Sequence, residues 1–241
     1  MFLAIFGAYM KKGLGLITVS LCLLVYLSNC NKTNTVAPSA LRVFNIDYTL
    51  QPQDMYLNNQ VQATNIAYAN DNSYVSVLPG TYNIKFAPAG SSNFNADYNI
   101  DFSTGKNYLM FLFGSGSQLQ SEAFDVNPLT LGIDTSEIRF FNFSPNAPLM
   151  DIGIKNTDTS KLDTTYTIYT HRYFNDIYSN RLLTNFLIMP SGTYSFKLRY
   201  ADTTLAFDSI QLTLGDRRSY TILARGNYGS TPAFRVDTLQ H

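Results

Sequence analysis

The sequence predicts an all-β protein built from two tandem antiparallel β-sandwich domains of immunoglobulin-like or transthyretin-like type. A turn-and-strand module at 78–86 returns at 189–200, and each copy opens a strand in which apolar and polar side chains alternate. The 17 Tyr and 17 Phe residues favour strands over helices. Short apolar runs recur about every 8–12 residues between Gly-, Pro- and Asn-containing turns, a spacing typical of sandwiches.

Other segments recur in the same order around this module, which indicates a duplication. The segment LRVFN at 41–45 is echoed by IRFFN at 138–142, and KNYLMFLFG at 106–114 corresponds to RSYTILARG at 218–226. The first pair is 97 residues apart, from 41 to 138, and the second is 112 apart, from 106 to 218. The second copy therefore contains about 15 additional residues, which we expect between positions 151 and 189.

A unit of about 100 residues is long enough to bury its own core and too long for a solenoid repeat. We therefore predict a first sandwich at 41–127, a linker at 128–137 and a second sandwich at 138–241. The 17 basic and 17 acidic residues balance. That balance argues against nucleic acid as a partner, because a nucleic-acid site needs a basic patch.

The first 29 residues are typical of a secretory signal peptide. Lys11 and Lys12 precede an uncharged apolar run at 13–27. Fifteen residues are fewer than the roughly 20 that a transmembrane helix needs. Translation is expected to start at Met10, and the preceding residues are interpreted as an upstream extension.

The apolar run ends in LSNC at 27–30, which resembles a bacterial lipoprotein cleavage box. This resemblance implies that Cys30 is acylated and becomes the first residue of the mature protein. More than one acyl chain is needed for stable attachment to a bilayer. We expect a polar tether at 30–40 and a location in the cell envelope, at the outer membrane, facing the periplasm or the surface. The alternative is an ordinary secreted protein with a leftover cysteine.

Each predicted domain contains eight short strands separated by polar turns. In the first domain we expect strands near 41–46, 54–58, 61–68, 73–78, 81–86, 96–102, 107–113 and 120–126. In the second we expect them near 138–143, 150–155, 164–170, 182–189, 193–200, 204–213, 218–225 and 233–238. The segment 108–113 is almost wholly apolar, which predicts an interior strand covered on both faces. The additional residues centre on 171–178 and are expected to form a long loop or a short helical turn.

These segments resemble the bacterial domain-of-unknown-function 4397 family. Residues 139–148 (RFFNFSPNAP), followed by DIGI at 151–154, resemble its opening strand, Ser-Pro-Asp-Ala-Pro turn and Asp-led second strand, with Asn146 in place of the Asp. Residues 74–82 (YVSVLPGTY) match its middle segment. The resemblance implies envelope lipoproteins of β-sandwich type with no established activity. Pro-Gly-Thr-Tyr also occurs in transthyretin-like and collagen-adhesin B-type sandwiches, so the sheet topology stays open.

The sequence favours no catalytic residue, metal or cofactor. A catalytic triad needs a base beside its nucleophile, and only His171 and His241 are available. One internal histidine is too few for a zinc site. Calcium remains a candidate for two loops rich in Asn and Asp, although such clusters usually form turns. These loops contain Asn70, Asp71 and Asn72, and Asn156, Asp158 and Asp163.

Two kinds of contact are predicted from the repeat. Arg42 and Asp54 are twelve positions apart, as are Arg139 and Asp151, and we expect each arginine to form a structural ion pair with its aspartate across neighbouring strands. Most tyrosines alternate into the core. The insertion instead offers residues for contact with a partner, namely Tyr169, His171, Tyr173 and Tyr178.

The expected function is a membrane-tethered, non-catalytic binding or scaffold module that engages an unknown protein or glycan. The alternative is an enzyme, or an accessory subunit of one, acting on an envelope polysaccharide or protein. An enzyme should have a cleft with convergent carboxylates of perturbed pKa. A third possibility is an assembly accessory that offers an uncovered strand edge to a partner chain.

Overall fold

The computed structural model describes residues 36–115, 118–126, 131–157 and 165–241, and Ala37–His241 form one compact unit. The predicted signal peptide and the lipid-attachment residue Cys30 lie outside the described residues. So do Asp158 and Asp163 of the second candidate calcium loop and part of the predicted linker.

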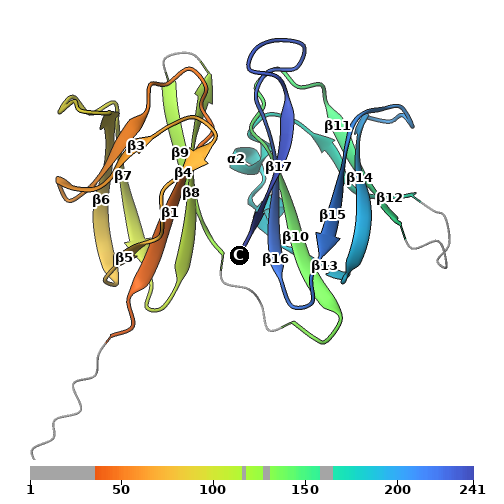
Figure 1. Ribbon diagram of the computed structural model, residues 1–241, viewed down its shortest axis with the longest axis horizontal. Helices are drawn as coiled ribbons and strands as arrows, with labels where there is room; N and C mark the ends of the chain where they lie inside the picture. The colour runs from red at the N-terminus through yellow and green to blue at the C-terminus, as the bar shows by residue number, and fades with distance from the viewer. Residues whose placement is uncertain (1–35, 116–117, 127–130, 158–164) are drawn as a thin grey trace, which may run out of the picture. The chain divides into compact units, whose positions relative to one another are not determined.

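The first sandwich consists of two facing sheets (Figure 1). Sheet A contains β1 (Ser39–Asn45), β4 (Asn70–Asp71), β5 (Val75–Val77), β8 (Asn107–Ser115) and β9 (Gln118–Asp125). Sheet B has the order β3 (Gln60–Ile66), β2 (Gln53–Leu57), β6 (Gly80–Pro88) and β7 (Ala96–Phe102).

The second sandwich repeats this arrangement. Sheet C has the order β13 (Leu187–Pro190), β10 (Thr135–Asn142), β16 (Ser219–Arg225) and β17 (Arg235–Gln240). Sheet D has the order β12 (Thr165–Arg172), β11 (Met150–Asn156), β14 (Gly192–Tyr200) and β15 (Ala206–Leu214). The insertion forms two short helical turns, α2 (Asp176–Ser179) and η1 (Arg181–Thr184).

The predicted all-β sandwich fold is confirmed, with two differences in detail. The sheets are mixed, because β1 pairs with β8 and β10 with β16 in parallel. The strand predicted at 182–189 is shorter, because its first residues form η1 and only 187–190 pair with β10.

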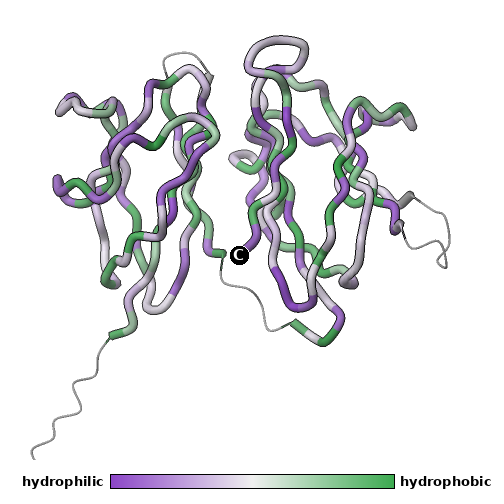
Figure 2. The backbone as a smooth tube through the Cα atoms, in the orientation of Figure 1, coloured by the Kyte–Doolittle hydropathy of each residue, from purple (hydrophilic) through white to green (hydrophobic). Residues whose placement is uncertain are grey.

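Each sandwich encloses its own hydrophobic core, and hydrophobic and hydrophilic residues alternate along the strands (Figure 2). The four tyrosines predicted to face inward all pack in these cores: Tyr82, Tyr108, Tyr194 and Tyr220. The side-chain period of two therefore assigns the inner faces correctly.

The repeated turn depends on its glycine. Gly80 and Gly192 have φ angles of 141° and 146°, a region that residues with a side chain rarely adopt. A Cβ atom added at Gly80 would lie 3.8 Å from the ring of Tyr82, and one added at Gly192 would lie 3.7 Å from the ring of Tyr194. The Gly-Thr-Tyr segment thus combines the required backbone conformation with a ring that packs back over the turn.

A third hydrophobic cluster contains side chains from sheets A and C and from α2. Leu109, Phe111 and Phe113 of β8 belong to it, whereas Met110 and Leu112 of the same strand belong to the first core. The cluster also contains Phe141, Phe143 and Leu223 from the second sandwich, and Ile177 from α2. The prediction that 108–113 is covered on both faces is therefore confirmed.

The predicted Arg–Asp ion pairs are wrong. Arg42 forms its ion pair with Asp71, and Arg139 bonds to Thr221 and to main-chain carbonyls. β1 and β2 belong to different sheets, as do β10 and β11. In each sandwich the neighbours of the Arg and the Asp point into the core, so the two charged side chains project from opposite outer faces.

The two aspartates have another role, which is the same in both sandwiches. Asp54 accepts hydrogen bonds from the main-chain N–H groups of Asn65 at 2.8 Å and Gly90 at 2.9 Å. Asp151 accepts from those of His171 at 2.9 Å and Asp202 at 3.1 Å.

All four N–H donors belong to residues with positive φ, and the ladders on β2 and β11 shift register beside each aspartate. Each carboxylate therefore stabilises two features. One is the irregular edge strand, β3 or β12, and the other is the turn that follows β6 or β14.

We expect Asp54→Ala and Asp151→Ala each to lower the free energy of unfolding by about 2–4 kcal/mol, because two main-chain donors lose a charged acceptor. Asp97→Ala is the matched control. Its side chain is exposed on β7, so the cost should stay below about 1 kcal/mol. Urea denaturation measures all three. If all three variants lost the same small amount of unfolding free energy, the structural role assigned to Asp54 and Asp151 would be wrong.

Candidate functional site: a groove between beta7, beta9 and the helical insertion

The insertion is anchored by a buried ion pair. The side chains of Arg172 and Asp176 are each 1% exposed. Nε and Nη2 of Arg172 donate to the two carboxylate oxygens at 2.5 and 2.9 Å, and Nη2 also donates to the Phe140 carbonyl at 2.9 Å. The guanidinium lies over the rings of Phe140 and Tyr169 at 5.3 and 5.2 Å. A four-residue helix, which would be marginal alone, is thereby fixed.

The insertion also contacts β9. The side-chain amide of Asn175 donates to Gln120 Oε1 at 3.1 Å, and Arg181 forms an ion pair with Glu122 at 2.6 Å. Because Ile177 is buried in the third hydrophobic cluster, α2 is held on both its apolar and its polar sides.

A groove of about 440 Å³ lies between β7, β9 and α2. Its apolar and aromatic lining consists of Tyr98, Phe113, Leu119 and Tyr178. Its polar lining consists of Gln120, Ser121, Glu122 and Asn175. The volume and the mixture of rings with a few polar groups are typical of small-molecule sites.

A second hollow of about 310 Å³ continues along the same strands. It shares Tyr98, Ser121 and Glu122 with the first and extends to Asp101 and Ala123. The Tyr98 hydroxyl donates to the Leu119 carbonyl at 3.0 Å and so bridges the edge strands of sheets A and B. Burial raises the pKa of the Tyr98 hydroxyl above that of an ordinary tyrosine.

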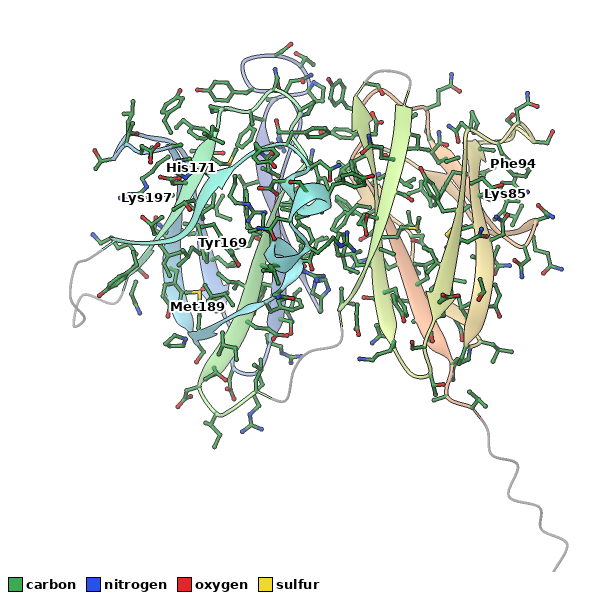
Figure 3. The ribbon with its side chains drawn as sticks, turned by 180° about the vertical axis from the view of Figure 1, so that it is seen from behind. Lys85, Phe94, Tyr169, His171, Met189 and Lys197 are labelled. Atoms are coloured by element: carbon green, nitrogen blue, oxygen red, sulfur yellow. The ribbon has the colours of Figure 1, made fainter. Side chains whose placement is uncertain are left out.

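Of the four partner-contact residues predicted from the sequence, only Tyr178 lines this groove, and it is 78% exposed. Tyr173 is exposed but bonds to Ser179 through its hydroxyl. His171 lies on the outer side of the second sandwich, where its Nε2 is 3.0 Å from the Asp202 carboxylate (Figure 3).

The prediction that Tyr169 contacts a partner is corrected, because its side chain is turned into the second sandwich (Figure 3). Its hydroxyl donates to the Ile138 carbonyl at 3.3 Å. Burial raises the pKa of Tyr169 to about 12. The ring packs on the Arg172 guanidinium and is partly buried against the second core, so it supports the insertion.

Arg139 and His241 form a second buried polar group. Arg139 is 2% exposed, its guanidinium lies 4.3 Å from the ring centre of Phe186, and burial lowers its pKa to about 10. Thr221 Oγ1 lies 2.9 Å from Arg139 Nε and 2.8 Å from His241 Nε2. Burial, together with the charges of Arg139 and Arg42, lowers the pKa of His241 to about 3, so this imidazole is neutral at physiological pH.

The first candidate calcium loop is occupied by structural contacts. Asp71 pairs with Arg42, and Asn72 Oδ1 accepts from the Val43 N–H at 2.5 Å. In the part of the chain that the structure describes, no three His, Cys, Asp or Glu side chains gather as they would around a metal ion. Among the same residues, no helix has the length and hydrophobicity required to cross a bilayer.

The fold and the groove define an all-β protein of two β-sandwiches with one lined groove at a strand edge. Residues 39–153 match the family model described as "Domain of unknown function (DUF4397)", which confirms the predicted resemblance over that segment. The match spans the first sandwich and continues through β10 into β11. No curated protein matches the chain.

Among the solved structures that the chain is similar to are two with low identity. One is described as "Alpha-glucan binding by a streptococcal virulence factor" and has 10% identity, a TM-score of 0.25, and coverage of 77% of this chain and 92% of that one. The other is a leucine-rich repeat protein from Bacteroides thetaiotaomicron, with 10% identity, a TM-score of 0.20, and coverage of 81% of this chain and 26% of that one. Both TM-scores are below 0.5, so neither likeness carries an argument about function.

We expect Asp176→Ala to lower the free energy of unfolding by about 3–5 kcal/mol, because it leaves the buried Arg172 guanidinium without its counter-ion. Lys106→Ala is the control. It removes an ion pair with Asp125 whose side chains are about 40% exposed, and it should cost less than about 1 kcal/mol. Chemical denaturation of both variants provides the comparison. A loss for Asp176→Ala no larger than the control would show that the ion pair does not anchor the insertion.

Proposed function

We propose that this protein is an envelope-anchored lipoprotein that acts as a non-catalytic binding module, with the groove between β7, β9 and α2 as its binding surface. The observation that carries the proposal is the groove itself, where Tyr98, Gln120 and Tyr178 converge from three separate segments of the chain.

The geometry supports binding because the groove walls are held before any ligand arrives. β7 and β9 belong to the packed sheets of the first sandwich, and α2 is fixed by the buried Arg172–Asp176 pair. A ligand that enters such a site orders few protein side chains, which lowers the entropic cost of binding.

Glu122 is the carboxylate of the groove nearest the insertion, and it is paired with Arg181. A paired carboxylate holds the wall together and is poorly suited to proton transfer, which favours binding over catalysis at this place.

The anchor is supported by the sequence alone, through the LSNC segment that ends in Cys30. Residues 31–38 separate this cysteine from β1 of the first sandwich and are long enough to hold the domain away from a bilayer.

We expect metabolic labelling with an alkyne fatty acid to mark the wild-type protein and the membrane fraction to contain it. Cys30→Ala should lose the label, because the diacylglycerol is attached to the sulfur of this residue and the further acyl chain to its amino group. Cys22→Ala is the matched control, since this cysteine lies within the apolar run that is removed, and it should keep the label. Labelling of Cys30→Ala at the wild-type level would refute the anchor.

The binding surface is tested by modification of exposed tyrosines with tetranitromethane, followed by mass spectrometry. We expect Tyr178 to be protected in intact envelopes relative to purified protein, because the occupant covers its ring. Tyr166 is the matched control, as it is 59% exposed on β12 away from the groove, and it should react equally in both. Equal modification of Tyr178 in both preparations would contradict the proposal.

A further inference from the structure

The groove is elongated. Its two hollows share three residues and together follow β9 from Leu119 to Ala123 and β7 from Tyr98 to Asp101. Three to four residue steps along a strand span about 10–13 Å, so the groove suits an extended ligand.

The lining combines ring faces with planar polar groups. Tyr178 presents an exposed ring from a fixed helix, and Gln120 and Asn175 present carboxamides beside it. Asn175 Nδ2 donates to Gln120 Oε1, so Gln120 Nε2 and Asn175 Oδ1 are the atoms that a ligand would contact. A carboxamide donates and accepts hydrogen bonds, and a tyrosine ring offers apolar area at a low entropic cost. Hydroxyl groups and the C–H face of a sugar ring match these two features.

The residues that line the two hollows include no Lys, Arg or His, and Arg181 beside them is paired with Glu122. The Asp101 carboxylate accepts a hydrogen bond from the neutral Thr81 hydroxyl, which does not neutralise its charge. A groove with a carboxylate and no lining cation disfavours a phosphate or a polyanionic polymer.

One main-chain acceptor of the edge strand β9 is already hydrogen-bonded within the protein. β9 is the last strand of sheet A, and an added peptide strand would need its main-chain acceptors. The Leu119 carbonyl is already bonded to the Tyr98 hydroxyl at 3.0 Å. Side-chain recognition of a ligand is consequently favoured over strand addition at this position.

We propose that the groove binds an extended, neutral oligosaccharide segment. Tyr178 stacks on a sugar ring, and Gln120 and Asn175 exchange hydrogen bonds with sugar hydroxyls. This inference rests on the proposed function and names the class of ligand for the same groove.

Native gel electrophoresis of the full-length protein in detergent tests it, with polysaccharides embedded in the gel. The neutral probes are dextran, yeast mannan, xylan and galactomannan, and the anionic probe is alginate. We expect at least one neutral polymer to retard the wild-type protein, and Tyr178→Ala and Gln120→Ala to raise its apparent dissociation constant about tenfold or more.

Two matched variants serve as controls. Tyr166→Ala and Gln211→Ala remove the same residue types from exposed positions outside the groove, on β12 and β15, and should migrate as the wild type does. Urea denaturation confirms that each variant is folded, and Tyr98→Phe provides a further groove variant that removes a single hydroxyl.

Two results would overturn the inference: no retardation by any neutral polymer, whether or not alginate retards the protein, or equal retardation of Tyr178→Ala and the wild type. Protection of Tyr178 in envelopes combined with any of these results would leave the binding module intact and exclude a neutral glycan. Equal modification of Tyr178 in envelopes and in purified protein would instead refute the proposal that the groove is a binding surface.

Discussion

Sheets A and C bury apolar side chains on both faces, and the rest of the structure depends on this constraint. Along β8, Met110 and Leu112 pack in the first core, whereas Phe111 and Phe113 point the other way. A sheet with two apolar faces needs two covers, because exposed aromatic area is unfavourable in water. The third hydrophobic cluster provides the second cover and combines side chains of both sandwiches within one compact unit.

Polar groups inside this apolar setting are placed where the backbone is irregular. Asp54 and Asp151 accept main-chain hydrogen bonds at shifts in strand register, and the Arg172 guanidinium binds the Asp176 carboxylate and so fixes α2. His171, whose N–H bonds to Asp151, directly precedes Arg172. The irregular end of β12 therefore leads into the anchored insertion, and the insertion in turn forms one wall of the groove.

The two sandwiches contribute differently to the groove. The first half supplies β7 and β9, and the second supplies α2, which lies in the additional residues of that copy. The outer face of sheet B remains polar, with Lys85 4.9 Å from the ring centre of Phe94 (Figure 3). A repeat that is symmetric in its cores thus carries an asymmetric surface feature, and this feature supports the proposed function.

The sequence by itself determined the all-β class, the duplicated order of strands, the inward tyrosines and the covered strand at 108–113. Each of these follows from local periodicity, because the side-chain period of a strand is two wherever the strand lies. The tertiary structure alone decided which strands share a sheet. For this reason the spacing of Arg42 and Asp54 suggested a contact that the intervening core forbids, and the spacing of Arg139 and Asp151 did the same. It also decided that Tyr169 turns inward onto Arg172. Finally, it brought Tyr98, Gln120 and Tyr178 together, since residues about 20–80 positions apart meet only through long-range packing, which a local pattern does not encode.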